Sequence, residues 1–229
     1  MSNAEVDSGL VRQLQERSQL IAAGRRPLGW KAGFGAPASL ERFRLDGPLI
    51  GFMTDASVLA DGSEVDITGW GRAVAEPEIF VVLGADIDPG GGPDGARAAV
   101  SALGPAIELA NIDPPPEDVE VILAGNIFHE SVVLGAADPN RRGADLSGLE
   151  ARVTVDGEEL HRTTRLEDLT GRIVDVLFHL ATLLGGHGET MRAGDVVICG
   201  SVVPPIDLTP GTTVGFELHP LSPISVSVS

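Results

Sequence analysis

The 229-residue sequence predicts a mostly β, α+β fold with mixed sheets, one long helix and a few short ones. Three observations support this prediction. Short runs rich in Val and Ile recur along the chain, as at 78–84 and 224–228, which is typical of strands. The 29 glycines and 16 prolines indicate many turns between short elements. The clearest helical period is at 166–184.

The elements are predicted in chain order from periodicity and turn residues. The first helix is expected at 8–23, where Leu10, Leu14 and Ile21 share one face. The run 78–84 is apolar on both faces, which is typical of a buried strand. The other predicted elements are a short helix at 37–45, a loop at 88–95, a helix at 95–103, and strands at 105–111, 131–135, 151–160, 195–203, 212–218 and 224–228.

Particular side chains define three further features. Aliphatic residues from Leu166 to Leu184 form one stripe, and Gly185-Gly186 is expected to end that helix. Asp156-Gly157 predicts a hairpin turn. Residues 113–117 contain three prolines and are expected to form an extended connection, because proline disrupts both helices and ladders.

Composition excludes several classes of function. The net charge of −17 argues against sequence-independent nucleic-acid binding and against an anionic membrane surface. The single cysteine, Cys199, excludes an intramolecular disulfide, which fits a reducing cytoplasm. No secretory signal is expected, and the apolar runs are too short for a membrane span.

Lys31 is the only lysine, whereas the other 15 of the 16 Lys and Arg residues are arginine. It stands between Trp30 and Phe34 in a Gly-rich segment, where both aromatic residues are expected to shield it from water. A desolvated ammonium can lose its proton and act as an acid or base, which a guanidinium does not do. Either Lys31 has such a role, or an Arg-biased composition retained one lysine by chance.

Three glutamates form a candidate metal site. Glu76 and Glu78 are two residues apart and therefore project to one face of an extended chain, and Pro77 predicts a strand start or a bulge there. Glu108 lies in an otherwise apolar strand with few local cationic partners. Carboxylate oxygens suit Mg²⁺ or Mn²⁺. Alternatively, Glu76 and Glu78 are solvated and Glu108 pairs with an arginine.

Several motifs occur in the order found in one family. They are Lys31-Ala32-Gly33, Pro48-Leu49-Ile50-Gly51, Glu76-Pro77-Glu78, Pro105-Ala106-Ile107-Glu108, Met191-Arg192-Ala193-Gly194-Asp195 and Cys199-Gly200-Ser201. This order resembles the fumarylacetoacetate hydrolase superfamily, in its hydratase and decarboxylase branch. The resemblance implies a mixed β-sheet roll of that type over residues 28–229, preceded by a helical segment at 1–27.

The resemblance also implies the chemistry. A Mg²⁺ or Mn²⁺ ion would be held by Glu76, Glu78 and Glu108. Lys31 would transfer a proton, or anchor a substrate carboxylate, during lyase chemistry on a small 2-oxo acid or 2-hydroxydienoic acid. The implied substrate contacts are Asn126, Gly200 and Ser201, although Asn126 serves equally well to close a loop. Members of the family associate, so a homo-oligomer is expected.

Departures from the family pattern keep alternatives open. Leu49 stands where hydratases of this branch carry an acidic residue, and residues 125–128 replace their Asp-Asn-Ala-Ser. His129 either substitutes for these lost polar groups or is an ordinary core or surface residue. The order of lysine before the glutamates favours a lyase over a hydrolase, and a hydratase is the first hypothesis. The alternatives are a 2-oxo-acid decarboxylase, an acylpyruvate-type C–C hydrolase, and a non-catalytic subunit that binds metal and 2-oxo acid.

Overall fold

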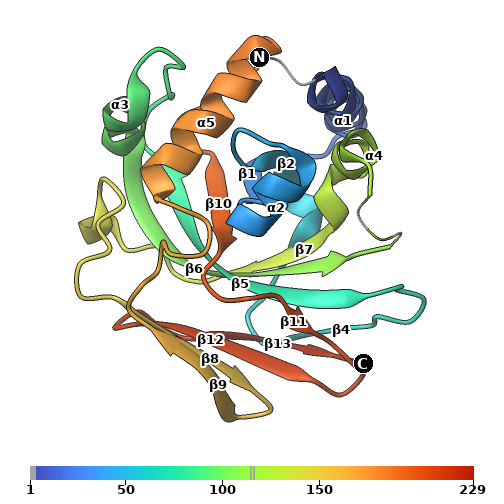
Figure 1. Ribbon diagram of the computed structural model, residues 1–229. Helices are drawn as coiled ribbons and strands as arrows, with labels where there is room; N and C mark the ends of the chain where they lie inside the picture. Colours follow the sequence, from blue (N-terminus) through green and yellow to red (C-terminus); the bar gives the residue numbers. More distant parts are fainter. Residues whose placement is uncertain (1–3, 114, 116) are drawn as a thin grey trace.

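The computed structural model describes residues 4–113, 115 and 117–229, which form two β-sheets and five α-helices (Figure 1). The helices are α1 (Ala4–Ala22), α2 (Pro37–Phe43), α3 (Gly92–Ala99), α4 (Val119–Ala124) and α5 (Ile173–Gly186). The strands are β1 (Pro27–Gly33), β2 (Leu49–Thr54), β3 (Val58–Leu59), β4 (Ser63–Val65), β5 (Ala73–Leu83), β6 (Val100–Asn111), β7 (His129–Leu134), β8 (Glu150–Val155), β9 (Glu158–Thr163), β10 (Val196–Ser201), β11 (Ile206–Asp207), β12 (Thr213–His219) and β13 (Ile224–Val228). None of these helices is long and apolar enough to span a membrane.

The larger sheet has the strand order β2-β1-β10-β5-β6-β7-β3, and β11 also pairs with β5. The smaller sheet has the order β4-β13-β12-β8-β9. The larger sheet is mixed, because β1 pairs with β10 in parallel whereas β5 and β6 are antiparallel. In Figure 1 the larger sheet is strongly curved, with helices α1, α4 and α5 above it and the smaller sheet below. The predicted α+β, mostly β fold is confirmed.

The core explains which side of β5 is available for a site. Ile79 and Val81 point to one face of this strand and join the main hydrophobic core, which also includes Phe216 of the smaller sheet. Phe80 points to the other face and belongs to a separate, smaller cluster. Glu78 is two residues from Phe80 and therefore shares that second face.

Most predicted elements are present with boundaries shifted by a few residues. Helices α1 and α2, the hairpin of β8 and β9 around Asp156-Gly157, and strands β7, β10, β12 and β13 occupy their predicted segments. The extended connection predicted at 113–117 depends on three prolines, of which Pro114 and Pro116 lie outside the described residues.

Helix α5 begins at Ile173, so the prediction that it starts at Leu166 is wrong. Gly171 adopts a φ of +86°, and Arg172 is extended, which separates the preceding turn from the helix. The Glu167 side chain accepts a hydrogen bond of 2.8 Å from the backbone N–H of Ile173. A local cap therefore sets the start of the helix.

The predicted loop at 88–95 and helix at 95–103 are displaced. Helix α3 already begins at Gly92 and ends at Ala99, and β6 starts at Val100. Val100 to Leu103 pair with the end of β5, so ladder hydrogen bonding overrides the local helical tendency there.

Glu76-Pro77-Glu78 lies in the middle of β5, so the prediction that it starts the strand is wrong. The Pro77 carbonyl accepts a hydrogen bond of 2.9 Å from Val202, just beyond the end of β10. Proline has no N–H, and the nitrogen of Pro77 faces the same neighbour, β10. The register between β10 and β5 shifts there, between Ile198 and Ser201. The irregularity that accommodates Pro77 is thus in the neighbouring strand.

Strands β1 and β2 and helix α4 were not predicted. Glycines interrupt the apolar alternation of both strands, at Gly29 and Gly33 in β1 and at Gly51 in β2. Both strands are nonetheless well paired, because β1 lies between β2 and β10. Sheet position, which the sequence does not reveal, decides their structure.

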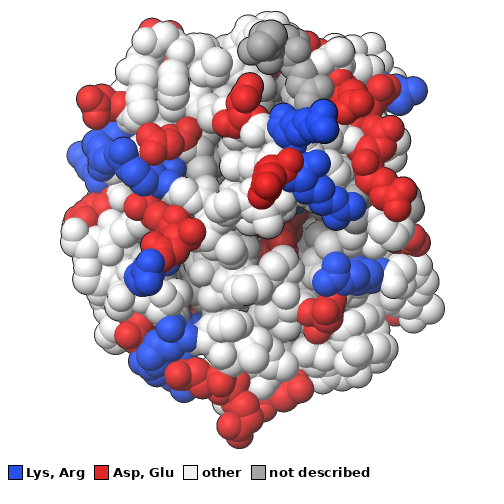
Figure 2. Space-filling model, viewed as in Figure 1, with Lys and Arg blue, Asp and Glu red and all other residues white. Residues whose placement is uncertain are grey.

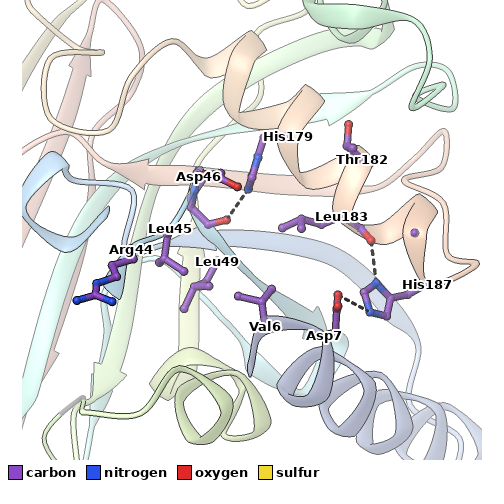
Figure 3. A pocket seen from close by; sticks show the side chains of 13 residues that line it. Val6, Asp7, Arg44, Leu45, Asp46, Leu49, His179, Thr182, Leu183 and His187 are labelled. Carbon is purple, nitrogen blue, oxygen red and sulfur yellow. Dashed lines mark hydrogen bonds and ion pairs between the residues drawn. The ribbon is translucent and has the colours of Figure 1, made fainter. Parts of the chain in front are cut away.

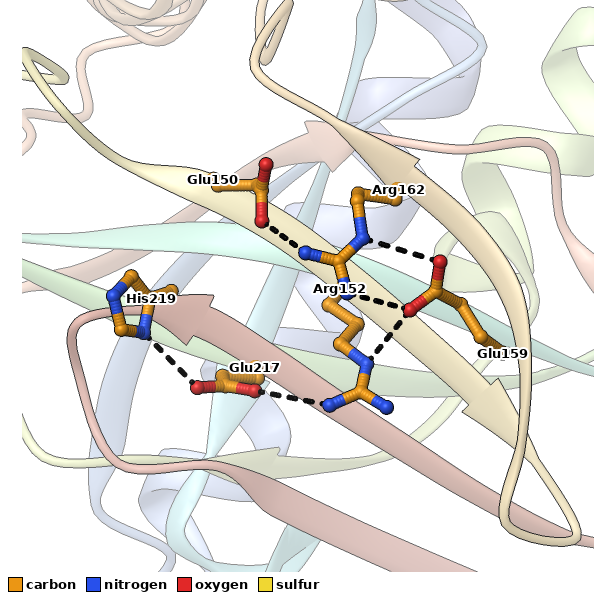
Figure 4. Close-up of polar contacts among 6 residues, drawn as sticks. All are labelled: Glu150, Arg152, Glu159, Arg162, Glu217 and His219. Atoms are coloured by element: carbon orange, nitrogen blue, oxygen red, sulfur yellow. Dashed lines mark hydrogen bonds and ion pairs between the residues drawn. The ribbon is translucent and has the colours of Figure 1, made fainter.

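Ion pairs link the exposed strands of the smaller sheet (Figure 4). Arg152 and Arg162 both donate to Glu159, at 2.9 and 2.7 Å. Arg162 also pairs with Glu150 at 2.6 Å, which joins β8 to β9. Exposed pairs of this kind contribute about 0–1 kcal/mol each. The network therefore aligns these strands more than it stabilises the fold.

Candidate active site

Three glutamates from two neighbouring strands converge on one face of the larger sheet. Glu76 on β5 lies directly opposite Glu108 on β6. Glu78 lies two residues along β5, on the same face. One carboxylate oxygen of each residue lies within 4.8 Å of those of the other two. Strand alternation and the β5–β6 register together form this cluster.

Lys31 reaches the same cluster from β1 and is only 1% exposed. Its Nζ forms an ion pair with Oε1 of Glu108 and lies 3.2 Å from the backbone oxygen of Ile127. Gly51, its partner residue on β2, leaves room for the side chain: a Cβ there would lie 2.7 Å from Lys31 Cγ. The only lysine of the chain is therefore held against the acidic cluster.

Trp30 does not shield Lys31, contrary to expectation. As adjacent strand residues, the two side chains point to opposite faces. The Trp30 indole donates a hydrogen bond of 3.1 Å to Asp195, and the Arg17 guanidinium lies 4.5 Å from a Trp30 ring centroid. Phe34, in contrast, lines the same cavity as Lys31. Burial of Lys31 therefore comes from the sheet itself and from one of the two expected aromatic residues.

Glu108 has two nitrogen partners, and both come from other strands rather than from its local sequence. His129, at the start of β7, places Nδ1 2.7 Å from Oε1 of Glu108. Lys31 binds the same oxygen. Sequence reasoning left the role of His129 open. The signal that would have selected it is its place at the entry to a strand that pairs with the strand of Glu108.

Burial and neighbouring charges separate the pKa values of the three acids. For Glu108, burial acts to raise the pKa, but the charges of Lys31 and His129 outweigh it and lower the pKa. Burial, reinforced by the charge of Glu108, raises the pKa of Glu76 to about 7. The same causes raise the pKa of Glu78 well above its ordinary value. Ionising all three acids together is therefore unfavourable without a cation, and a bound cation would favour their ionised forms.

The residues fit a divalent cation. Oε2 of Glu108 is buried and has no hydrogen-bond partner among the described residues. Such an orphaned carboxylate oxygen is costly unless a ligand satisfies it. Together with oxygens from Glu76 and Glu78 it offers a hard donor set suited to Mg²⁺ or Mn²⁺.

The raised pKa of Glu76 predicts how pH affects the metal-free protein. This carboxyl titrates at 4.5 as an ordinary glutamate and at about 7 in the fold. Between these values the folded state keeps a proton that the unfolded state has lost, so stability falls as pH rises. In EDTA, we expect the melting temperature to decrease from about pH 5 to about pH 7.5, and stabilisation by added Mg²⁺ to increase over that range.

Glu76→Gln is the matched control for this prediction, because it removes the titrating group but keeps the side-chain shape. Thermal unfolding followed by circular dichroism should show a shallower pH dependence for this variant. An identical pH dependence in both proteins would assign the effect to other groups.

A cavity of about 440 Å³ opens beside this cluster and is lined by Lys31, Glu76 and Glu78. Phe34 and Phe128 form part of its wall, with ring centroids 6.4 Å apart. Figure 2 shows acidic and basic side chains around a hollow on the face in view. The cavity thus combines charged groups with an apolar aromatic wall, as small-molecule sites do.

The three residues expected to contact substrate are placed differently. Gly200 and Ser201 line the cavity, and the backbone N–H of Gly200 donates to Oε2 of Glu78 at 2.6 Å. The Ser201 hydroxyl lies 2.6 Å from the carbonyl oxygen of Val203. Asn126 uses both polar atoms of its amide on the backbone of Phe52, at 2.8 and 2.9 Å. In this geometry Asn126 closes the loop before β7.

A second cavity, of about 750 Å³, lies between α1, α5 and the segment before β2 (Figure 3). His187 there lies 3.5 Å from Asp7, and His179 lies 3.1 Å from the carbonyl oxygen of Pro48. Among the described residues, the acidic side chains that lie close enough together to hold a metal ion are Glu76, Glu78 and Glu108. Glu76 and Glu78 line the cavity of about 440 Å³. The smaller cavity is therefore the candidate active site.

Comparison with known proteins adds to this geometry. The sequence profile of the fumarylacetoacetate (FAA) hydrolase C-terminal family matches residues 35–229. A 4-oxalocrotonate decarboxylase of Pseudomonas sp is 28% identical over 232 residues, which cover 97% of this chain and 89% of that protein. A 2-keto-4-pentenoate hydratase of Paraburkholderia xenovorans (strain LB400) is 25% identical over 217 residues, covering 93% and 80% respectively.

The fold also matches a solved structure, 4-oxalocrotonate decarboxylase from Pseudomonas putida G7 complexed with magnesium and adipate. The TM-score is 0.88 at 23% identity, with 99% of this chain and 86% of that chain covered. At this identity the likeness concerns the fold.

Proposed function

Because this chain belongs to the fumarylacetoacetate hydrolase family, we propose that it is a divalent-metal-dependent lyase for a 2-oxo or 2-hydroxydienoic acid, similar to 2-keto-4-pentenoate hydratase. One observation carries the proposal: three glutamates, two of them buried, and the only lysine converge beside one cavity. A lyase agrees with the two relatives that match nearly the whole chain, of which one is a decarboxylase and the other a hydratase.

The three glutamates would hold the cation and Lys31 would move the proton. Bound Mg²⁺ or Mn²⁺ would supply Lewis acidity for negative charge that develops on a 2-oxo acid. Hydration adds one water across a carbon–carbon double bond, so one substrate carbon must gain a proton. Lys31 lines the cavity and, unlike an arginine, can both release and regain a proton.

Aromatic side chains favour an unsaturated substrate tail. The rings of Phe34 and Phe43 meet edge to face with centroids 5.6 Å apart, and Phe128 lies beside Phe34. All three line the cavity. They would exclude bulk water from the reacting carbons and leave the polar end of the substrate toward the acids.

The test is turnover of 2-hydroxypenta-2,4-dienoate with Mg²⁺, followed by the loss of ultraviolet absorbance of the diene. We expect turnover that EDTA abolishes and added Mg²⁺ or Mn²⁺ restores. No turnover of any 2-oxo acid, combined with oxalate-dependent thermal stabilisation of the metal-loaded protein, would instead support a non-catalytic binding subunit. Release of pyruvate from acylpyruvates would support the hydrolase alternative.

A decarboxylase is the second candidate, because two arginines line the cavity. Arg42 and Arg72 offer positive charge to a second carboxylate of a 2-oxo diacid. Arg72 also donates a hydrogen bond of 2.7 Å to Asp207. CO₂ release from a 2-hydroxymuconate-type substrate, reduced by Arg72→Gln while monoacid turnover persists, would favour this candidate over the hydratase.

The remaining expectations concern the assembled protein. We propose that the protein acts in the cytoplasm, because its single cysteine is buried and free. We also propose that it is a homo-oligomer, because the family it resembles associates. A monomeric mass by light scattering would contradict the oligomer.

A further inference from the structure

The two carboxylate oxygens of Glu108 have different surroundings. Oε1 is contacted by Lys31 Nζ and by His129 Nδ1. Oε2 is buried and has no partner among the described residues. The carboxylate is therefore anchored through Oε1, and Oε2 remains available to a ligand.

The His129 contact has one possible direction. An ionised carboxylate only accepts hydrogen bonds, so Nδ1 of His129 must be the donor in the 2.7 Å contact with Glu108. The His129 side chain is only 4% exposed, and its Nε2 is buried without a partner among the described residues. A buried donor committed to one acceptor is suited to orienting it.

The backbone around His129 is built to make this contact. The β6–β7 register shifts between Leu109 and Ala110, and Ala110 is paired with His129. Such irregularities re-aim side chains next to functional sites. The three preceding residues, 126–128, all have positive φ, and Asn126 ties them to Phe52 of β2. His129 therefore enters the strand from a pinned turn.

We propose that His129 is a positioning residue that holds Oε1 of Glu108, so that Oε2 faces the cation and Lys31 is free to leave Glu108 for the substrate. Lys31 alone cannot serve both purposes, because one ammonium would have to anchor the ligand and transfer the proton. The inference rests on the proposed metal-dependent function, but its test does not require turnover.

The experiment measures Mn²⁺ and Mg²⁺ affinity by titration calorimetry in three variants. His129→Leu removes the donor and should weaken binding by about 10- to 100-fold, the range seen when a partner of a metal ligand is lost. His129→Asn keeps an N–H near the Nδ1 position and should restore most of the affinity. His179→Leu removes a histidine hydrogen bond outside the site and should leave affinity unchanged.

The outcomes separate this inference from the proposed function. Wild-type protein that binds neither ion would contradict the metal-dependent function itself. Normal affinity in His129→Leu, or equal loss in His129→Asn and His129→Leu, would overturn the positioning role. If His129→Leu does not fold, imidazole ¹⁵N NMR of the wild type remains decisive: Nδ1 of His129 should carry hydrogen with and without Mg²⁺. An unprotonated Nδ1 would overturn the inference.

Discussion

Glu108→Gln is expected to abolish metal-dependent activity and to destabilise the metal-free fold. The carboxylate is fully buried and neutralises Lys31, which is itself 1% exposed. Removing one partner of a buried ion pair costs about 3–5 kcal/mol, since the other charge remains buried without compensation. The substitution also removes one anionic oxygen from the donor set. We expect Mg²⁺ affinity to fall by more than about 100-fold, beyond the effect of losing an outer partner.

Calorimetric titration with Mg²⁺ and urea unfolding in EDTA would measure these two effects separately. Glu130→Gln is a matched control, because Glu130 is on β7 near the site but its side chain is exposed. It should change neither quantity. Normal metal content together with normal turnover in Glu108→Gln would exclude Glu108 as a ligand.

Lys31→Met is expected to lower kcat by about 10²- to 10⁴-fold, the usual contribution of a positioned acid or base. Metal binding should persist, because Lys31 contacts Oε1 of Glu108, leaves Oε2 to the cation and donates no oxygen of its own. This split between turnover and affinity distinguishes Lys31 from the glutamates. Steady-state kinetics and Mg²⁺ titration of the same preparation measure both.

Lys31→Arg is the matched variant, because it keeps the charge but cannot release a proton near neutral pH. We expect it to remain as slow as Lys31→Met. Full activity in Lys31→Arg would reduce the role of Lys31 to electrostatics. An amine-selective reagent offers an independent check, since the N-terminus is the only other amine. Inactivation that Mg²⁺ plus oxalate prevents would place Lys31 in the site.

Local sequence was enough to predict the parts of the site that depend on one strand. Glu76 and Glu78 share a face because alternation in an extended chain has a period of two. Lys31 was distinguished by composition alone. Motif order then joined these residues and Glu108 into one candidate metal site.

Long-range pairing decided what the sequence left open. The β5–β6 register places Glu108 opposite Glu76, and no local pattern encodes that register. Pairing on both sides makes the Gly-rich β1 a strand. The register shift in β10 accommodates Pro77 within β5. The predicted strand start at Pro77 was wrong for this reason.

The partners of Glu108 show the same division most clearly. The sequence by itself determined that a glutamate would be buried in an apolar strand and would need a counter-charge. Only the tertiary structure decided that Lys31 and His129 both contact Oε1, which leaves Oε2 without a partner among the described residues. The physical reason is that hydrogen bonds act over about 3 Å, and residues far apart in the chain reach that range only through sheet register and a pinned turn.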